Sequence, residues 1–129
     1  MANPAVNPPE GLLDRLVATR YGDEGQGVWS AQIRAEEGEM ADHMVRLAEL
    51  MVAGTPPSDP AAQDEIDWYY RAANQYGGIN AATFAAIGEA LMDNEPTRAI
   101  FDDVAEGLGA YQRDAMAAYA QARLSMEGA

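Results

Sequence analysis

Apolar residues recur at intervals of three, four and seven between Val28 and Val52, and this spacing constrains the fold more than any other feature. Such intervals place side chains along one side of an α-helix, so one amphipathic helix is predicted over this range. Gly54 suits the left-handed position beyond a helix end, and Pro56 stops the helix there. β-Branched residues are scattered and never alternate with polar ones, so no strand is predicted. The predicted apolar stripe consists of Trp29, Ile33, Met40, Met44, Leu47 and Met51.

Proline, glycine and asparagine residues divide the rest of the chain into further helical segments. Asp59 offers an N-cap, and Pro60 fits the first position of a second long helix. Gly77 and Gly78 end that helix, and Asn80 caps the next one. We therefore expect an all-α fold of about five to six helices joined by short loops. The predicted helices after the first long one cover residues 60–76, 81–92, 96–103 and 104–125.

The chain of 129 residues suffices for one compact domain. Residues 1–10 are rich in proline and asparagine and predict a disordered tail, which a short amphipathic segment over residues 12–20 follows. Three glycines then predict a loop over residues 22–27. We therefore expect an N-terminal tail and short helix over residues 1–27 and one helical domain over residues 28–125.

Charge and composition exclude several classes of function. The chain has 21 acidic and 8 basic residues, a formal net charge of -13, and should repel nucleic acid. It contains no cysteine and a single histidine, which excludes disulfides, thiol chemistry and a zinc site built from both residue types. Apolar runs are short, and no signal peptide opens the chain. We expect a cytoplasmic protein, a monomer or weak dimer, that needs no cofactor and does not bind a membrane.

Catalytic and metal-binding patterns are weak. None of the serines lies in a G-x-S-x-G turn, and no phosphate-binding loop is present. His43 could act as a general base, but a structural or surface role is the simpler interpretation. Glu39 and His43 are four residues apart and share a helix face that a metal could bridge, yet di-metal sites in bundles need a second histidine. We predict no catalytic residue and no metal site.

Aromatic residues point to binding instead. The chain has six tyrosines and two tryptophans against only two phenylalanines, although a core that needs bulk alone would use phenylalanine. Tyrosine and tryptophan combine a large apolar face with a polar group. Four of them lie between Trp68 and Tyr76, and methionines flank them. A cleft of this kind suits a planar or heterocyclic ligand; a core whose hydroxyls reach the surface is the alternative.

An ordered series of short motifs runs from Trp29 to Ala120. A long acidic helix ends in LMVAGTPP at 50–57, and DPAAQ at 59–63 opens the aromatic-rich helix. The later motifs are IGEAL at 87–91, DNEP at 93–96, FD at 101–102, EGLGAY at 106–111 and RDAM at 113–116. Together they resemble the TipAS-type antibiotic-recognition domain, the ligand-binding half of thiostrepton-responsive, MerR-like regulators. That domain also occurs alone and in albicidin-binding resistance proteins.

The resemblance implies a globin-like arrangement of helices around a deep cleft, without haem, and non-enzymatic capture of a bulky, largely planar antibiotic or similar natural product. Some members trap thiopeptides through a cysteine near the end of the aromatic helix, where this chain reads YGGI at 76–79. Because the chain has no cysteine, covalent capture is excluded. Residues 95–99 also lack the aromatic that the family carries there, and the MerR-type DNA-binding helices are missing. We therefore expect a receptor domain that does not regulate transcription by itself.

Three hypotheses of function follow. The first is non-covalent sequestration of an antibiotic, which gives drug resistance or drug sensing. The second is a small enzyme that modifies a natural product, with His43 or a carboxylate as acid or base. The third is an interaction module that docks a partner's helix. For the first, the predicted ligand-binding residues come from the two long helices and the last one: Trp29, Met40, His43, Met44, Trp68, Tyr69, Asn74, Tyr76 and Tyr111.

Overall fold

Helices are the regular elements of the part of the chain that the computed structural model describes, residues 5–9, 11–12, 15, 31–75 and 77–124. Within these residues no strand occurs, which confirms the predicted all-α fold. No helix among them is long and apolar enough to cross a membrane. The elements are α2 (Ala31–Val52), α3 (Pro60–Ala73), α4 (Ala81–Asp93), α5 (Glu95–Val104), α6 (Leu108–Tyr119) and the short π-helix η2 (Ala120–Leu124).

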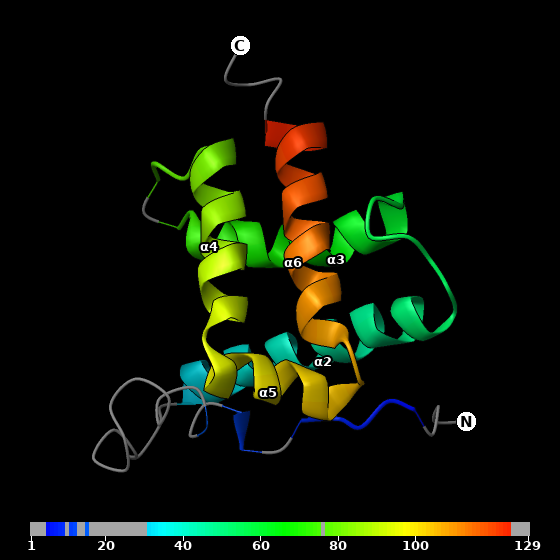
Figure 1. Ribbon diagram of the computed structural model, residues 1–129. Helices are drawn as coiled ribbons and strands as arrows, with labels where there is room; N and C mark the ends of the chain where they lie inside the picture. Colours follow the sequence, from blue (N-terminus) through cyan, green and yellow to red (C-terminus); the bar gives the residue numbers. More distant parts are fainter. Residues whose placement is uncertain (1–4, 10, 13–14, 16–30, 76, 125–129) are drawn as a thin grey trace.

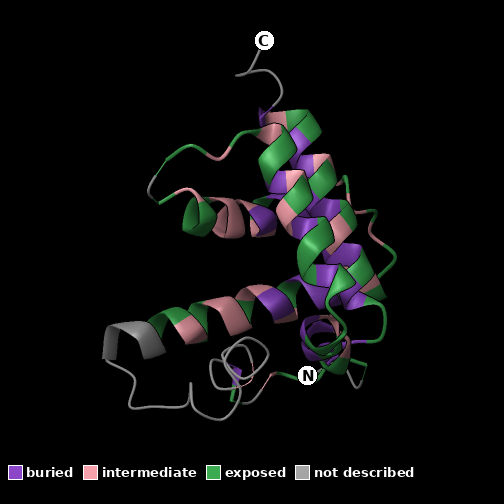
Figure 2. Ribbon diagram, turned by 60° about the vertical axis from the view of Figure 1, so that its left-hand side comes forward, coloured by how far each residue is buried: buried purple, intermediate pink, exposed green. Residues whose placement is uncertain are grey.

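Two helices far apart in the sequence form the centre of the molecule. Figure 1 shows α4 and α6 side by side, with α3 crossing behind them and α2 and α5 toward one end. Figure 2 shows that buried residues on α2 lie in its second half, where the helix meets the bundle. The described residues from Ala35 to His43 are exposed or half-buried, so the first half of α2 has side chains free for other contacts.

The core is built from apolar side chains of every helix. Phe84 on α4 is fully buried, and its ring lies 5.4 Å from Tyr70 on α3 and 5.6 Å from Tyr119 on α6. Gly88 lets α4 approach α6, because a Cβ at this position would lie 3.2 Å from the sulfur of Met116. The packed aromatic rings and the close approach of α4 to α6 therefore hold α3, α4 and α6 together.

The helix starts follow the predicted caps with one shift, whereas α3 ends at Ala73 and not at residue 76 as predicted, because Asn74 leaves the helical backbone. Asp59 and Asn80 accept hydrogen bonds from the backbone of Ala61 and Thr83, at 2.9 and 2.8 Å, as N-cap residues do. The last helix, however, begins at Leu108 and not at residue 104, because Gly107 before it takes a left-handed backbone with φ of 90°. Residue 104 instead ends α5.

The N-terminal segment packs against the bundle where disorder was predicted for residues 1–10. Val6 is buried, and the backbone N–H of Asn7 donates to the carbonyl of Val104 at 2.7 Å. Arg15 forms an ion pair with Asp103 at 2.6 Å. The proline-rich composition therefore does not prevent residues 5–9 from lying along α5, because one apolar side chain and one backbone bond suffice to dock them.

Alanine at two glycine positions should have opposite effects on stability. Gly107→Ala is expected to lower the free energy of unfolding by about 1–2 kcal/mol, because an L-residue resists a left-handed backbone. The added Cβ would meet only the Met51 sulfur at 3.9 Å, so the cost is conformational and not steric. Gly38 lies within α2, and a Cβ added there would have no atom within 4 Å. Gly38→Ala should therefore raise the free energy of unfolding by about 0.5–1 kcal/mol. Urea denaturation of both variants tests this; equal midpoints would contradict it.

Candidate functional site

An aromatic cluster joins the two long helices α2 and α3. It consists of His43 on α2 and the neighbouring Trp68 and Tyr69 on α3. The ring centroids of His43 and Trp68 lie 5.1 Å apart at an interplanar angle of 30°. Trp68 and Tyr69 meet edge to face at 5.1 Å and 87°. Both geometries are favourable for aromatic pairs, so the cluster holds the indole in a defined orientation.

A network of hydrogen bonds and ion pairs holds the rings of the same cluster in place. The Glu65 carboxylate lies 2.8 Å from Nδ1 of His43 and accepts a hydrogen bond from Nε of Arg46 at 2.7 Å. When Nδ1 carries a proton, it donates to this carboxylate. The indole N–H of Trp68 donates to the Glu39 carboxylate at 3.1 Å. These hydrogen bonds between side chains therefore connect α2 and α3 around the rings of the cluster.

A surface groove of about 270 Å³ lies beside the cluster, where the first half of α2 faces the end of α3. Trp68 is the aromatic residue that lines it. Most of its lining is charged or polar, and Trp68 supplies the large apolar surface on which a planar group could pack. The lining residues are Glu36, Glu39, Trp68, Arg71, Ala72 and Gln75.

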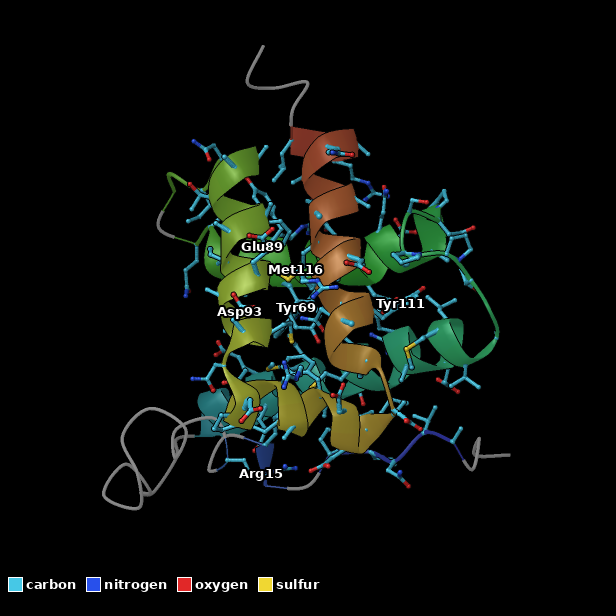
Figure 3. All side chains as sticks on the ribbon, viewed as in Figure 1. Arg15, Tyr69, Glu89, Asp93, Tyr111 and Met116 are labelled. Atoms are coloured by element: carbon cyan, nitrogen blue, oxygen red, sulfur yellow. The ribbon has the colours of Figure 1, made fainter. Side chains whose placement is uncertain are left out.

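Tyr69 combines an interior hydroxyl with a partly exposed ring. Its hydroxyl oxygen is buried and has no hydrogen-bond partner among the described residues. Burial raises the pKa of this hydroxyl far above its ordinary value, and the nearby Glu65 carboxylate raises it further. In Figure 3, Tyr69 is seen between α4 and α6, toward the middle of the molecule. An unpaired polar group in the interior costs stability, and it offers a hydrogen bond to a ligand that reaches it.

Removing the hydroxyl from two tyrosines should change stability in opposite directions. Tyr69→Phe is expected to raise the free energy of unfolding by about 1 kcal/mol, because it removes a buried group without a partner. Tyr111→Phe should lower it by about 1 kcal/mol, since that hydroxyl donates to the carbonyl of Thr55 at 2.8 Å. Denaturant unfolding measures both. A loss of stability in Tyr69→Phe would mean that its hydroxyl is satisfied after all.

The other predicted site residues are spread more widely. Met40 is half-buried on α2, whereas Met44 one turn later is fully buried in the core. Asn74 follows α3, and its side chain accepts a hydrogen bond from the backbone N–H of Ile79 at 3.0 Å. Tyr111 is buried on α6, where burial raises its pKa. Trp29 and Tyr76 lie outside the described residues. The structure thus brings together His43, Trp68 and Tyr69, with Met40 nearby in sequence.

Sequence reasoning missed the residues that fix the cluster. Glu65 and Arg46 were not among the predicted contacts, although Glu65 lies one helical turn before Trp68 and Tyr69. That spacing places it on their face of α3, so the signal was present. Arg71 and Gln75 follow Trp68 at helical intervals and line the groove, and the same rule could have found them. No group of three metal-ligating side chains occurs within the described ranges.

Most of the chain matches a known protein family. The TipAS antibiotic-recognition domain matches residues 17–119, which include α2 to α6 and the whole groove. The chain belongs to the TipAS antibiotic-recognition family. No curated protein and no solved structure matches it. Antibiotic recognition is thus the function of the family to which this chain belongs.

Proposed function

We propose that this TipAS domain binds a bulky aromatic or heterocyclic antibiotic, or a related natural product, without a covalent bond and so sequesters or senses it. The observation that carries the proposal is the oriented indole of Trp68 at the wall of the groove between α2 and α3. Planar ligands stack on such a surface. The absence of cysteine from the sequence leaves shape, stacking and charge as the means of binding.

The proposed contacts begin at the groove. Trp68 stacks on the ligand, while His43 and Tyr69 hold the indole in place. Met40 and Met44 extend apolar surface from α2 toward the core. The remaining predicted contacts stay predictions: Trp29 and Tyr76 lie outside the described residues, and Asn74 and Tyr111 do not line the groove.

The family also supports a wider proposal about the protein. We propose that its helices surround the ligand in the globin-like arrangement of TipAS domains, within residues 28–125. The domain then acts in the cytoplasm as a monomer or weak dimer, without a cofactor, nucleic acid or membrane. Its formal net charge of -13 supports the exclusion of nucleic acid, because phosphate binding needs cationic side chains.

Titration with a panel of natural-product antibiotics tests the proposal. Sequestration acts by mass action, so the dissociation constant must lie well below the drug concentration. At a ligand concentration of about 100 times Kd, folding gains about 2.7 kcal/mol, which corresponds to a rise in melting temperature of roughly 10 °C. Thermal shift and tryptophan fluorescence should both respond to at least one compound. A folded protein that responds to none of them would refute the proposal.

One observation favours a second candidate function. The distance of 2.8 Å between His43 and Glu65 is that of a carboxylate orienting a general base, so an enzyme that modifies the natural product is the alternative. Against it, Arg46 shares the same carboxylate oxygen, which weakens the hold of Glu65 on the imidazole. Mass spectrometry of the recovered compound distinguishes the two. Binding predicts an unchanged mass, and an altered mass would favour the enzyme.

A further inference from the structure

The charges that line the groove are unevenly paired. Glu36 is exposed, and its carboxylate has no hydrogen bond or ion pair with any other described residue. Glu39 accepts a hydrogen bond only from the neutral indole N–H of Trp68, at 3.1 Å. Arg71, the cation of this lining, is bound by the carboxylate of Asp67 at 2.7 Å. Among the described residues, the carboxylates of Glu36 and Glu39 therefore have no cationic partner, whereas Arg71 is paired with Asp67.

The Trp68 indole lies beside these charges and contacts two other rings. His43 covers one face of the Trp68 ring at 5.1 Å, and Tyr69 meets the ring edge-on. The hydrogen bond to Glu39 places a carboxylate at the edge of the same ring. Trp68 also lines the groove, so part of its side chain is open to a ligand there. The face of an indole attracts cations through its quadrupole, and tryptophan does so more strongly than the other aromatic residues.

We propose that this groove selects flat aromatic ligands that carry a positive charge, such as a quaternised nitrogen heterocycle. The inference rests on the proposed function and names the ligand class of the same site. The aromatic ring of the ligand packs on the part of Trp68 that lines the groove, and the cationic group faces the carboxylates of Glu36 and Glu39. Attraction by the net charge of -13 raises the local concentration of such a ligand, and an anionic analogue is repelled.

A matched set of small probes tests this selection. Quinoline, its N-methylated cation and its carboxylate share one ring system and differ in charge. Binding of each is followed by the NMR shifts of the Trp68 indole N–H and the Ala72 methyl group, which report on the groove itself. The cation is expected to bind about fivefold more tightly than quinoline, and the carboxylate more weakly than both. Raising the salt concentration should weaken binding of the cation and leave that of quinoline unchanged.

A double variant tests whether the carboxylates of Glu36 and Glu39 produce the preference for the cation. In Glu36→Gln with Glu39→Gln, the preference for the cation should disappear, while the glutamine at 39 can still accept the indole hydrogen bond. The control is Glu89→Gln with Glu106→Gln, two exposed carboxylates outside the groove, which changes net charge equally. The control should keep the preference. Glu89 is labelled on α4 in Figure 3.

Three other results would overturn the inference that the groove selects cationic ligands. Equal affinity for quinoline and its cation shows that the groove stacks rings without selecting charge, and the proposed function then stands. A preference that survives the Glu36 and Glu39 double variant assigns the selection to the net charge of the protein and not to the groove. If no probe shifts the groove signals, the inference fails, and the antibiotic titration above decides the proposed function separately.

Discussion

Trp68→Ala is expected to weaken binding of a planar antibiotic by about thirtyfold. Among the described residues, Trp68 is the aromatic side chain that lines the groove, and loss of a central tryptophan or of a stacking ring typically costs about 2 kcal/mol of binding free energy. Trp68→Phe should keep most of the affinity, because a smaller ring still stacks. Calorimetric titration with the compound found in the antibiotic panel measures both variants.

A matched control separates lost stacking from a general effect. Leu91 on α4 is also a large exposed apolar side chain, 39% exposed, and does not line the groove. Leu91→Ala should bind the ligand as the wild type does. Circular dichroism verifies that Trp68→Ala stays folded, which is expected since Trp68 is only half-buried. Wild-type affinity in a folded Trp68→Ala variant would move the ligand site away from this groove.

Phe84→Ala should cost the most stability of the variants considered, about 3–5 kcal/mol of unfolding free energy. Phe84 is fully buried, and its ring contacts Tyr70 and Tyr119 from two other helices. Truncation leaves a cavity where α3, α4 and α6 meet. The helices could fill this cavity only by shifting, which would break contacts that they make elsewhere in the core. A domain of this size has about 5–15 kcal/mol in total, so the loss is a large share of it.

Denaturant unfolding with a neighbour on the same helix checks this expectation. Ala86 is exposed on α4, and Ala86→Ser should change the unfolding free energy by no more than about 0.5 kcal/mol. If Phe84→Ala were as mild as this control, the aromatic contacts would not be the centre of the core. Because Phe84 does not line the groove, folded Phe84→Ala should keep its ligand affinity.

The helices were predictable because their signals are local. Asp59, Asn80 and Asn94 each cap a helix through a side chain that bonds the backbone two or three residues later. Glycine and proline likewise act within a few residues of their own position. The one misplaced start, at residue 104, followed from continuous apolar spacing across Gly107, whose left-handed backbone separates α5 from α6.

The site was only partly predictable, because helical spacing says which residues share a face and not what that face meets. Met40 and Met44 lie on the same stripe of α2, yet Met44 is buried in the core and Met40 is half-exposed. The difference arises where α2 enters the bundle, which depends on the packing of α3 and α6. Trp68 was among the predicted ligand contacts, but its partners Glu39 and His43 come from another helix.

The sequence by itself determined the all-α fold, most of the helix starts and the family, since each depends on residue types or on short spacings along one chain segment. Only the tertiary structure decided that α2 and α3 cross-link through Glu65 and that Trp68 walls a groove. Only it showed that no described cation pairs with Glu36 or Glu39 there, while Asp67 forms an ion pair with Arg71. The physical reason is that charge pairing and ring orientation depend on distances between helices, which packing of the whole core determines.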